Sequence, residues 1–389
     1  MGSNHNKDYQ QDGKTDKAIL TQQTIVMKTI SLCLIVKNEE AVLERCINSM
    51  RGAFDELIIV DTGSTDKTVE IAKSLGARVE HFKWIDDFAA ARNYSFSFAT
   101  GDWIMWVDAD DVLMEGDAER FREIVHEYDE GDVMGINFPY IYSHESTGTG
   151  EMPNFKYHRL RVMRREGNPI WKHRIHEFNE VQGLTICRDE VEFHHYREEG
   201  RGTQNTARNM RILKKVLADC TEEERPRYLF YYGKECIYNN KLDDAIAAFK
   251  EYIPLSNWLP EKHRAMYEMA VCYWKKGDEE NAKRYAHEAM LVDEDYVDPY
   301  ILLGQMAYEK GEWQRVIKWM RSALNCGPVQ TSFFDYIPFT TYVPYDYMAI
   351  AYWNLQDYKS AYECAQKCLE YKPHDPRYQH NEREIKQHV

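Results

Sequence analysis

The apolar residues of this 389-residue chain change their period once, at about residue 203. Before this point, short apolar runs typical of buried strands alternate with amphipathic segments typical of helices. After it, the strand signal disappears and a helical repeat continues to residue 389. A chain of this length has room for two substantial cores. The change of period therefore predicts an α/β domain at residues 28–202 and an all-α domain at 203–389. Residues 1–27 are polar and without periodicity, which predicts a disordered leader or an expression tag.

The first domain is predicted to contain a mostly parallel, doubly wound sheet. Strands are expected at residues 30–36, 56–61, 78–82, 102–107, 133–139 and 191–196, and helices at 40–51, 66–75, 88–99 and 115–128. Ligands of such sheets bind in the crevice at the carboxyl ends of the strands. Residues 141–150 are rich in Ser, Thr and Gly, so we expect a mobile loop near that crevice.

Small residues recur at fixed places in the second domain. In each repeat, a first position is followed by a second position twelve residues later and by a third position seven residues after the second. The residues at the three positions are Gly233, Ala270, Gly304 and Ala349; Ala245, Ala282, Val316 and Ala361; and Tyr252, Ala289, Ala323 and Cys368. This pattern resembles tetratricopeptide repeats, in which small residues let paired helices approach closely. The third and fourth repeats are further apart in the sequence than the others, which predicts an insertion between them. Its apolar residues 333–339 are expected to pack on the helices or, alternatively, to meet a partner.

Three carboxylates follow the apolar strand predicted at residues 102–107. Asp108 and Asp110 are separated by one residue, and Asp111 comes next. Carboxylates at a strand end can hold Mg²⁺ or Mn²⁺, which completes its coordination with water and phosphate oxygens. The alternative is a solvated acidic turn. This position predicts a site for a divalent cation and a nucleoside diphosphate.

Polar residues also follow the second and third predicted strands. Asp61 ends the second strand and is placed to accept a hydrogen bond from a nucleobase or ribose. Asp87 and Arg92 stand at the start of the helix that follows the third strand. The arginine suits a diphosphate, although an arginine on a helix is more often part of a surface ion pair.

Four segments together resemble family-two glycosyltransferases with the GT-A fold, which is Rossmann-like with a mostly parallel sheet. These segments are residues 31–40, 60–68, 88–93 and 106–111. Their order and spacing are more specific than any one of them. The resemblance implies that Asp61 and Asp87 hold the nucleobase and that Lys37 and Glu39 approach the nucleotide. It further implies that Asp108 contacts ribose and metal, while Asp110 binds the divalent ion that bridges the diphosphate.

The rest of the site is expected from the second half of this domain. Residues 159–165 and 171–177 resemble the Arg-Leu-Phe-Arg and Val-His-Glu arrangement of a bacterial subset of the family. Glu177 is the candidate general base that deprotonates the acceptor, unless it only pairs with a nearby arginine. The last strand ends in two imidazoles. His195 is the candidate third metal ligand, with His194 as the second choice.

The function expected from these features is a metal-dependent inverting glycosyltransferase. It would use Mn²⁺ or Mg²⁺ and a nucleotide-sugar, UDP-linked by expectation, and would act on a peptide or protein held by the helical repeats. The alternatives are a cell-surface or lipid-linked saccharide acceptor, or an inactive transferase whose repeats act as a scaffold; the repeats could also form a homodimer. A formal charge of −15 argues against nucleic-acid binding. No apolar run is long enough to span a membrane, so a cytoplasmic protein is expected.

Overall fold

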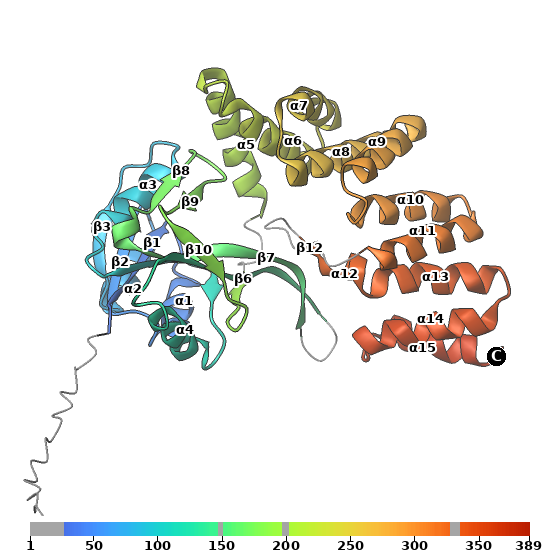
Figure 1. Ribbon diagram of the computed structural model, residues 1–389, viewed down its shortest axis with the longest axis horizontal. Coiled ribbons are helices and arrows are strands. Elements are labelled where there is room, and N and C mark those ends of the chain that lie inside the picture. Colours follow the sequence, from blue (N-terminus) through green and yellow to red (C-terminus); the bar gives the residue numbers. More distant parts are fainter. Residues whose placement is uncertain (1–26, 147–150, 197–201, 327–334) are drawn as a thin grey trace, which may run out of the picture.

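The computed structural model describes residues 27–146, 151–196, 202–326 and 335–389 (Figure 1). The predicted leader, the end of the predicted loop at 147–150 and the apolar residues Phe333 and Phe334 lie outside these ranges. Within them, a sheet domain comes first in the chain and a helical domain follows. This order confirms the predicted fold class, an α/β domain followed by helical repeats.

The sheet domain contains eleven of the described strands and four helices. In chain order its elements are β1 (Ile30–Val36), α1 (Leu43–Ser49), β2 (Glu56–Asp61), α2 (Thr68–Ser74), β3 (Arg78–His81), α3 (Phe88–Phe96), β4 (Trp103–Trp106), β5 (Asp111–Val112), α4 (Asp117–His126), β6 (Val133–Ser146), β7 (Glu151–Arg164), a 3₁₀ turn (Arg165–Gly167), β8 (Ile170–Lys172), β9 (Phe178–Glu180), β10 (Leu184–Cys187) and β11 (Phe193–His195).

The main sheet has the strand order β3-β2-β1-β4-β7-β6-β11-β5. The first four strands of this order pair in parallel, as the alternation of strands and helices predicts. β1, β2 and β4 are apolar and buried because helices cover both faces. Helices α1, α2 and α4 pack on one face, and α3 packs on the other.

Beyond β4 the sheet becomes mixed. β7 pairs antiparallel with both β4 and β6. The prediction of a loop from residue 141 is wrong for residues 141–146, because β6 continues to Ser146 and pairs with β7 along its length. The polar side chains there stand on a two-stranded arm that is only partly covered. A polar composition therefore did not exclude a strand.

The helical domain contains the elements α5 (Gly202–Asp219), α6 (Arg225–Tyr238), α7 (Leu242–Leu255), α8 (Leu259–Lys275), α9 (Glu279–Val292), α10 (Asp298–Glu309), α11 (Trp313–Asn325), β12 (Asp335–Tyr336), α12 (Ile337–Thr340), α13 (Tyr342–Asn354), α14 (Tyr358–Tyr371) and α15 (Pro376–Lys386). Helices α6 to α11 and α13 to α14 form four antiparallel pairs that follow one another in an arc (Figure 1). The recurring small residues lie inside these pairs. A Cβ on Gly233, for example, would lie 2.7 Å from the ring of Phe249.

The helical domain contacts the sheet domain at two separate places. At the first, α5 and α6 pack Ile212, Leu213 and Tyr228 against Ile175, close to Trp84 and Phe88. At the second, strand β12 of the insertion pairs antiparallel with β7 on the long arm.

The insertion therefore packs on both domains. The Tyr336 ring lies 4.7 Å from that of Phe155 on β7, and Phe339 packs among the helices. Beside it, Lys372 places its Nζ 2.6 Å from Glu145 Oε1 on β6. The expectation of packing is confirmed for residues 335–339, with the sheet arm as an additional partner that the sequence did not indicate.

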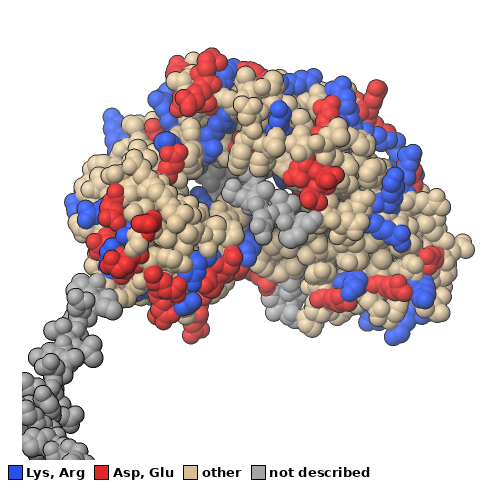
Figure 2. Space-filling model, in the orientation of Figure 1, with Lys and Arg blue, Asp and Glu red and all other residues tan. Residues whose placement is uncertain are grey.

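Charged side chains of both signs are interspersed on the face of the molecule seen in Figure 2. Among the helices that the structure describes, not one has an apolar stretch long enough to cross a lipid bilayer.

Candidate active site

The loop between β4 and β5 carries Asp108 and Asp110, and Asp111 is the first residue of β5. β4 lies next to β1 in the centre of the sheet and ends at Trp106, so Asp108 and Asp110 emerge at its carboxyl end. The chain then enters the short strand β5, which pairs antiparallel with β11. This pairing sets His195 directly opposite Asp111. Residues more than eighty positions apart thus meet in one corner.

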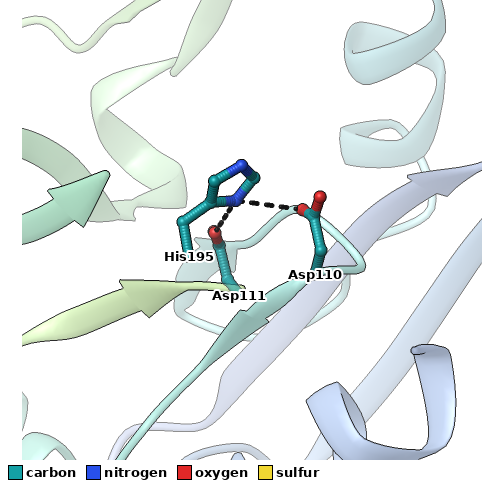
Figure 3. Close-up of side chains that lie close together, drawn as sticks. All are labelled: Asp110, Asp111 and His195. Atoms are coloured by element: carbon teal, nitrogen blue, oxygen red, sulfur yellow. Dashed lines mark ion pairs between the residues drawn. The ribbon is translucent and has the colours of Figure 1, made fainter. Parts of the chain in front are cut away.

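Asp110, Asp111 and His195 form this corner, and their potential ligand atoms all lie within 4.8 Å of one another (Figure 3). His195 Nδ1 is 3.2 Å from Asp110 Oδ1 and 3.4 Å from Asp111 Oδ1. Burial alone lowers the pKa of His195, but the two carboxylates outweigh it and raise this pKa to about 9. Carboxylate and imidazole donors suit Mn²⁺ and are compatible with Mg²⁺. The residues present therefore fit a divalent cation.

Asp111 has a structural role within this corner. It is fully buried, and its Oδ2 lies 2.9 Å from Arg161 Nη1. Tyr140 donates its hydroxyl to Oδ1, and the backbone N–H of Asp108 donates to Oδ2. Burial raises the pKa of Asp111, but the guanidinium of Arg161 is the main group that brings it below its usual value. Asp111 thus fixes the loop and orients His195.

His194, the second candidate ligand, points elsewhere because neighbouring strand residues face opposite sides. Its Nδ1 lies 2.9 Å from Nε2 of His144 on β6. The geometry favours His195 over His194 as the imidazole of this corner.

Asp108 is held by arginines. Arg92 Nη2 donates to Asp108 Oδ1 at 2.6 Å, and Arg159 Nη1 lies 3.5 Å from Oδ2. Burial raises the pKa of Asp108, but the Arg92 and Arg159 guanidiniums outweigh it and hold this pKa well below its usual range. Asp108 is therefore a neutralised carboxylate, whereas no arginine among the described residues forms an ion pair with Asp110.

Arg92 also binds the candidate base. Its Nε donates to Glu177 Oε1 at 2.8 Å, across 85 residues of sequence. The guanidinium lies 4.9 and 4.7 Å from the ring centroids of Trp106 and Trp171, which are themselves in edge-to-face contact. Only 8% of the Arg92 side chain is exposed. The expected diphosphate contact of Arg92 is untested, but its guanidinium is already shared by two carboxylates and two indoles.

A cavity of about 510 Å³ opens in front of this network. Six of the predicted site residues line it, namely Lys37, Glu39, Arg92, Asp108, Asp110 and His195. Glu177 is not among the lining residues, but it accepts a hydrogen bond from Arg92, which is. The cavity therefore gathers the predicted nucleotide and metal residues in one place.

Asp61 and Asp87 do not line this cavity. The Asp61 carboxylate accepts the backbone N–H groups of Gly63 and Ser64, which fixes the turn after β2. Asp87 is the N-cap of α3 and accepts the N–H of Ala90 at 2.9 Å. Nucleobase binding by these two residues stays a prediction.

Other residues of the site were given no role of their own in the sequence analysis. Trp84, Phe88 and Arg208 line the cavity, and Arg159 and Arg161 neutralise its carboxylates. Arg159 and Arg161 are two residues apart on β7, so both can face the same side of the sheet. This alternation of charged residues in the sequence could have indicated that both arginines face the site. Arg208 lies on a helix of the second domain and had no such signal.

Comparison with known proteins agrees with this geometry. Residues 31–184 match the model of glycosyl transferase family 2, and residues 263–296 and 348–375 match a tetratricopeptide repeat. The N-terminal domain belongs to glycosyl transferase family 2. The family match covers β1 to β7 and extends through Glu177, and it includes the Asp108 to Asp111 loop.

Two curated relatives share parts of the chain. A TPR repeat-containing protein of Synechococcus elongatus is 40% identical over 134 residues, which are 34% of this chain and 32% of that protein. The SPbeta prophage-derived glycosyltransferase SunS of Bacillus subtilis is 27% identical over 237 residues, which are 58% of this chain and 53% of that protein. The chain thus spans only about a third to a half of these relatives.

Among solved structures, residues 1–349 of TarS from S. aureus align with 68% of this chain and 91% of that one. The identity is 13% and the TM-score 0.37, at which the likeness supports no inference about function.

Proposed function

We propose that this chain is a metal-dependent inverting glycosyltransferase that moves a sugar from a UDP-sugar to a side chain of a peptide or protein. The proposal rests mainly on Asp110, whose carboxylate forms no ion pair with an arginine among the described residues. Its neighbours Asp108 and Asp111 are neutralised by arginines, while the Asp110 carboxylate faces His195 and the cavity. A carboxylate left without a guanidinium in such a place is suited to a metal ion.

Asp110 and His195 would hold the cation, which would supply positive charge to the diphosphate leaving group. Asp108 would contact the ribose or the metal, as the family resemblance implies. Lys37 and Glu39, at the end of β1, would lie along the nucleotide. Trp84 and Phe88 also line the cavity, with their ring centroids 4.7 Å apart.

Glu177 is the proposed general base. Its side chain is 11% exposed and is fixed by Arg92, which also fixes Asp108. One guanidinium therefore sets the distance between the base and the donor site. Taking a proton from the acceptor hydroxyl or thiol as it attacks the anomeric carbon is the step that Glu177 would assist.

The helical domain supports a peptide or protein acceptor because its first helices reach the base. Tyr231 on α6 stacks on the His176 ring at 4.0 Å, next to Glu177, and Arg227 donates to the His176 carbonyl. An acceptor bound along these helices would arrive beside Glu177.

Donor turnover tests the proposal. The full chain is incubated separately with UDP-glucose, UDP-N-acetylglucosamine and UDP-galactose, with Mn²⁺ or with EDTA, and UDP release is followed. We expect turnover of at least one donor that needs the metal and is lost in Asp110→Asn. Metal-independent turnover, or full activity of that variant, would refute the assigned metal corner, and no turnover of any donor would argue for the scaffold alternative.

A further inference from the structure

One cation in the donor cavity comes from the helical domain. Arg208 stands on α5, the first helix after the sheet domain, and lines the same cavity as Asp110 and His195. Its guanidinium lies 4.9 Å from the centroid of Phe88, at the start of α3. Arg208, which lies outside the segment matched by the family model, therefore forms part of the cavity wall.

The guanidinium of Arg208 has little to neutralise it. Its Nε and Nη2 donate to Oδ1 of the adjacent Asn209, at 3.2 and 3.1 Å, which is a neutral amide. No carboxylate of the described residues forms an ion pair with it, and Glu177 and Glu235 act on it only from a longer range. Arg92, the other arginine of the cavity, binds two carboxylates directly.

Because Arg208 is partly buried, leaving its guanidinium without a carboxylate partner costs free energy. The surrounding protein lowers the pKa of its guanidinium below the ordinary value, because a partly buried cation loses solvation. An anion brought into the cavity would compensate for that loss. A guanidinium also matches phosphate oxygens in a bidentate way that an ammonium such as Lys37 does not.

The cavity thus holds two complementary groups, the Asp110 carboxylate without an arginine and the Arg208 guanidinium without a carboxylate. A diphosphate with a divalent cation carries the matching charges, since the cation faces carboxylates and the phosphate oxygens face guanidinium donors. A neutral sugar or a nucleobase can hydrogen-bond to these groups but neutralises the charge of neither.

We propose that Arg208 binds the diphosphate of the nucleotide donor, so that the helical domain supplies part of the donor site. This inference rests on the proposed function. The position of Arg208 depends on docking of α5, which Arg211 supports through its ion pair with Asp86 and which the apolar cluster around Ile212 and Leu213 maintains. Donor binding and domain docking are coupled through this one helix.

The test measures the affinity of the full chain for uridine, UMP and UDP by calorimetry in Mg²⁺. The wild type should gain affinity from UMP to UDP. Arg208→Gln should weaken UDP binding by about tenfold or more, as expected for a lost hydrogen bond between charged groups, and should leave uridine binding within about twofold. Arg208→Lys should recover part of the loss, because it keeps the charge without the fork.

Arg211→Gln is the matched control, one turn further along α5 and half-exposed at the domain contact. It should leave UDP affinity within about twofold, because exposed ion pairs contribute little. Equal losses in Arg208→Gln and Arg211→Gln would assign the effect to docking and overturn the inference. Unchanged UDP affinity in Arg208→Gln would overturn it while the proposed function stands. A wild type that binds no UDP would overturn both.

Discussion

The Nε of Arg92 donates to Oε1 of Glu177 at 2.8 Å, so the candidate base is attached to the guanidinium that also holds Asp108. This arginine comes from α3, and its two partners come from the loop after β4 and from the segment between β8 and β9. The rings of Trp106 and Trp171 both contact its guanidinium. The relative position of base and donor site is thus set by one buried side chain.

Replacement of Arg92 tests this arrangement. Arg92→Leu leaves two largely buried carboxylates without their shared cation, and we expect a loss of about 3–5 kcal/mol in the free energy of unfolding. Arg92→Lys should fold better but lower kcat by more than about tenfold, because one ammonium cannot hold both carboxylates in the same geometry. Chemical denaturation and initial rates measure the two effects. A leucine variant as stable as the wild type would contradict the assigned pairing.

Glu177→Gln tests the role of the base. The variant keeps the shape of the side chain, so UDP affinity should stay within about twofold, while sugar transfer should fall by about 10²–10⁴. Glu180→Gln is the control, because Glu180 only forms a half-exposed ion pair with Lys172 on the neighbouring strand. Transfer by Glu177→Gln within about tenfold of the wild type would place the base elsewhere.

The contact between Tyr231 and His176 makes a separate prediction about the helical domain. Tyr231→Ala removes the ring stacked at 4.0 Å on the residue before Glu177 and should lower kcat by about tenfold with little change in the affinity for UDP. Tyr231→Phe keeps the ring and should restore most of kcat. If phenylalanine fails to restore it, the hydroxyl and not the stacking matters.

Stability should fall in acid because of buried imidazoles. Burial lowers the pKa of His176 to about 3 and that of His263 to about 4. In the unfolded chain a histidine takes up its proton near pH 6.5, so between about pH 6.5 and 4 the unfolded state binds more protons. The stability from these groups is present above pH 6.5 and is lost as the pH falls.

The melting temperature should therefore drop by about 5 °C or more between pH 7.5 and pH 5. His263 packs on Tyr296 with ring centroids 4.0 Å apart, and His263→Phe can keep that packing without a proton to bind. The slope of melting temperature against pH should be shallower in this variant. An unchanged slope would show that other groups cause the acid loss.

Much of the fold could be predicted from residue patterns because burial on both faces leaves a clear signal. β1 and β2 begin and end at the predicted residues, since their apolar runs are covered by helices on both sides. The end of β6 could not be predicted, because residues 143–146 are polar and their strand depends on pairing with β7. The strand β12 likewise exists only through its contact with β7.

The candidate site likewise contains some residues that the sequence predicts and others that it does not. Asp108, Asp110 and His195 were predictable because they stand at strand ends, where the topology brings side chains together. The pairing of Arg92 with Glu177 joins positions 85 residues apart, and no local pattern specifies it. Arg208 was missed because its place in the cavity depends on how α5 docks, and no residue of the helical domain was expected in the donor site.

The anomeric configuration of the transferred sugar shows directly whether the reaction is the proposed single displacement at the metal corner. A single displacement with Glu177 as base turns an α-linked donor into a β-linked product, so early ¹H spectra of UDP-α-sugar turnover with Mg²⁺, which is diamagnetic, should show the β anomer first. The same signal should be absent in Glu177→Gln and in Asp110→Asn. The appearance of the α anomer first, or of the β anomer at an undiminished rate in either variant, would contradict the account.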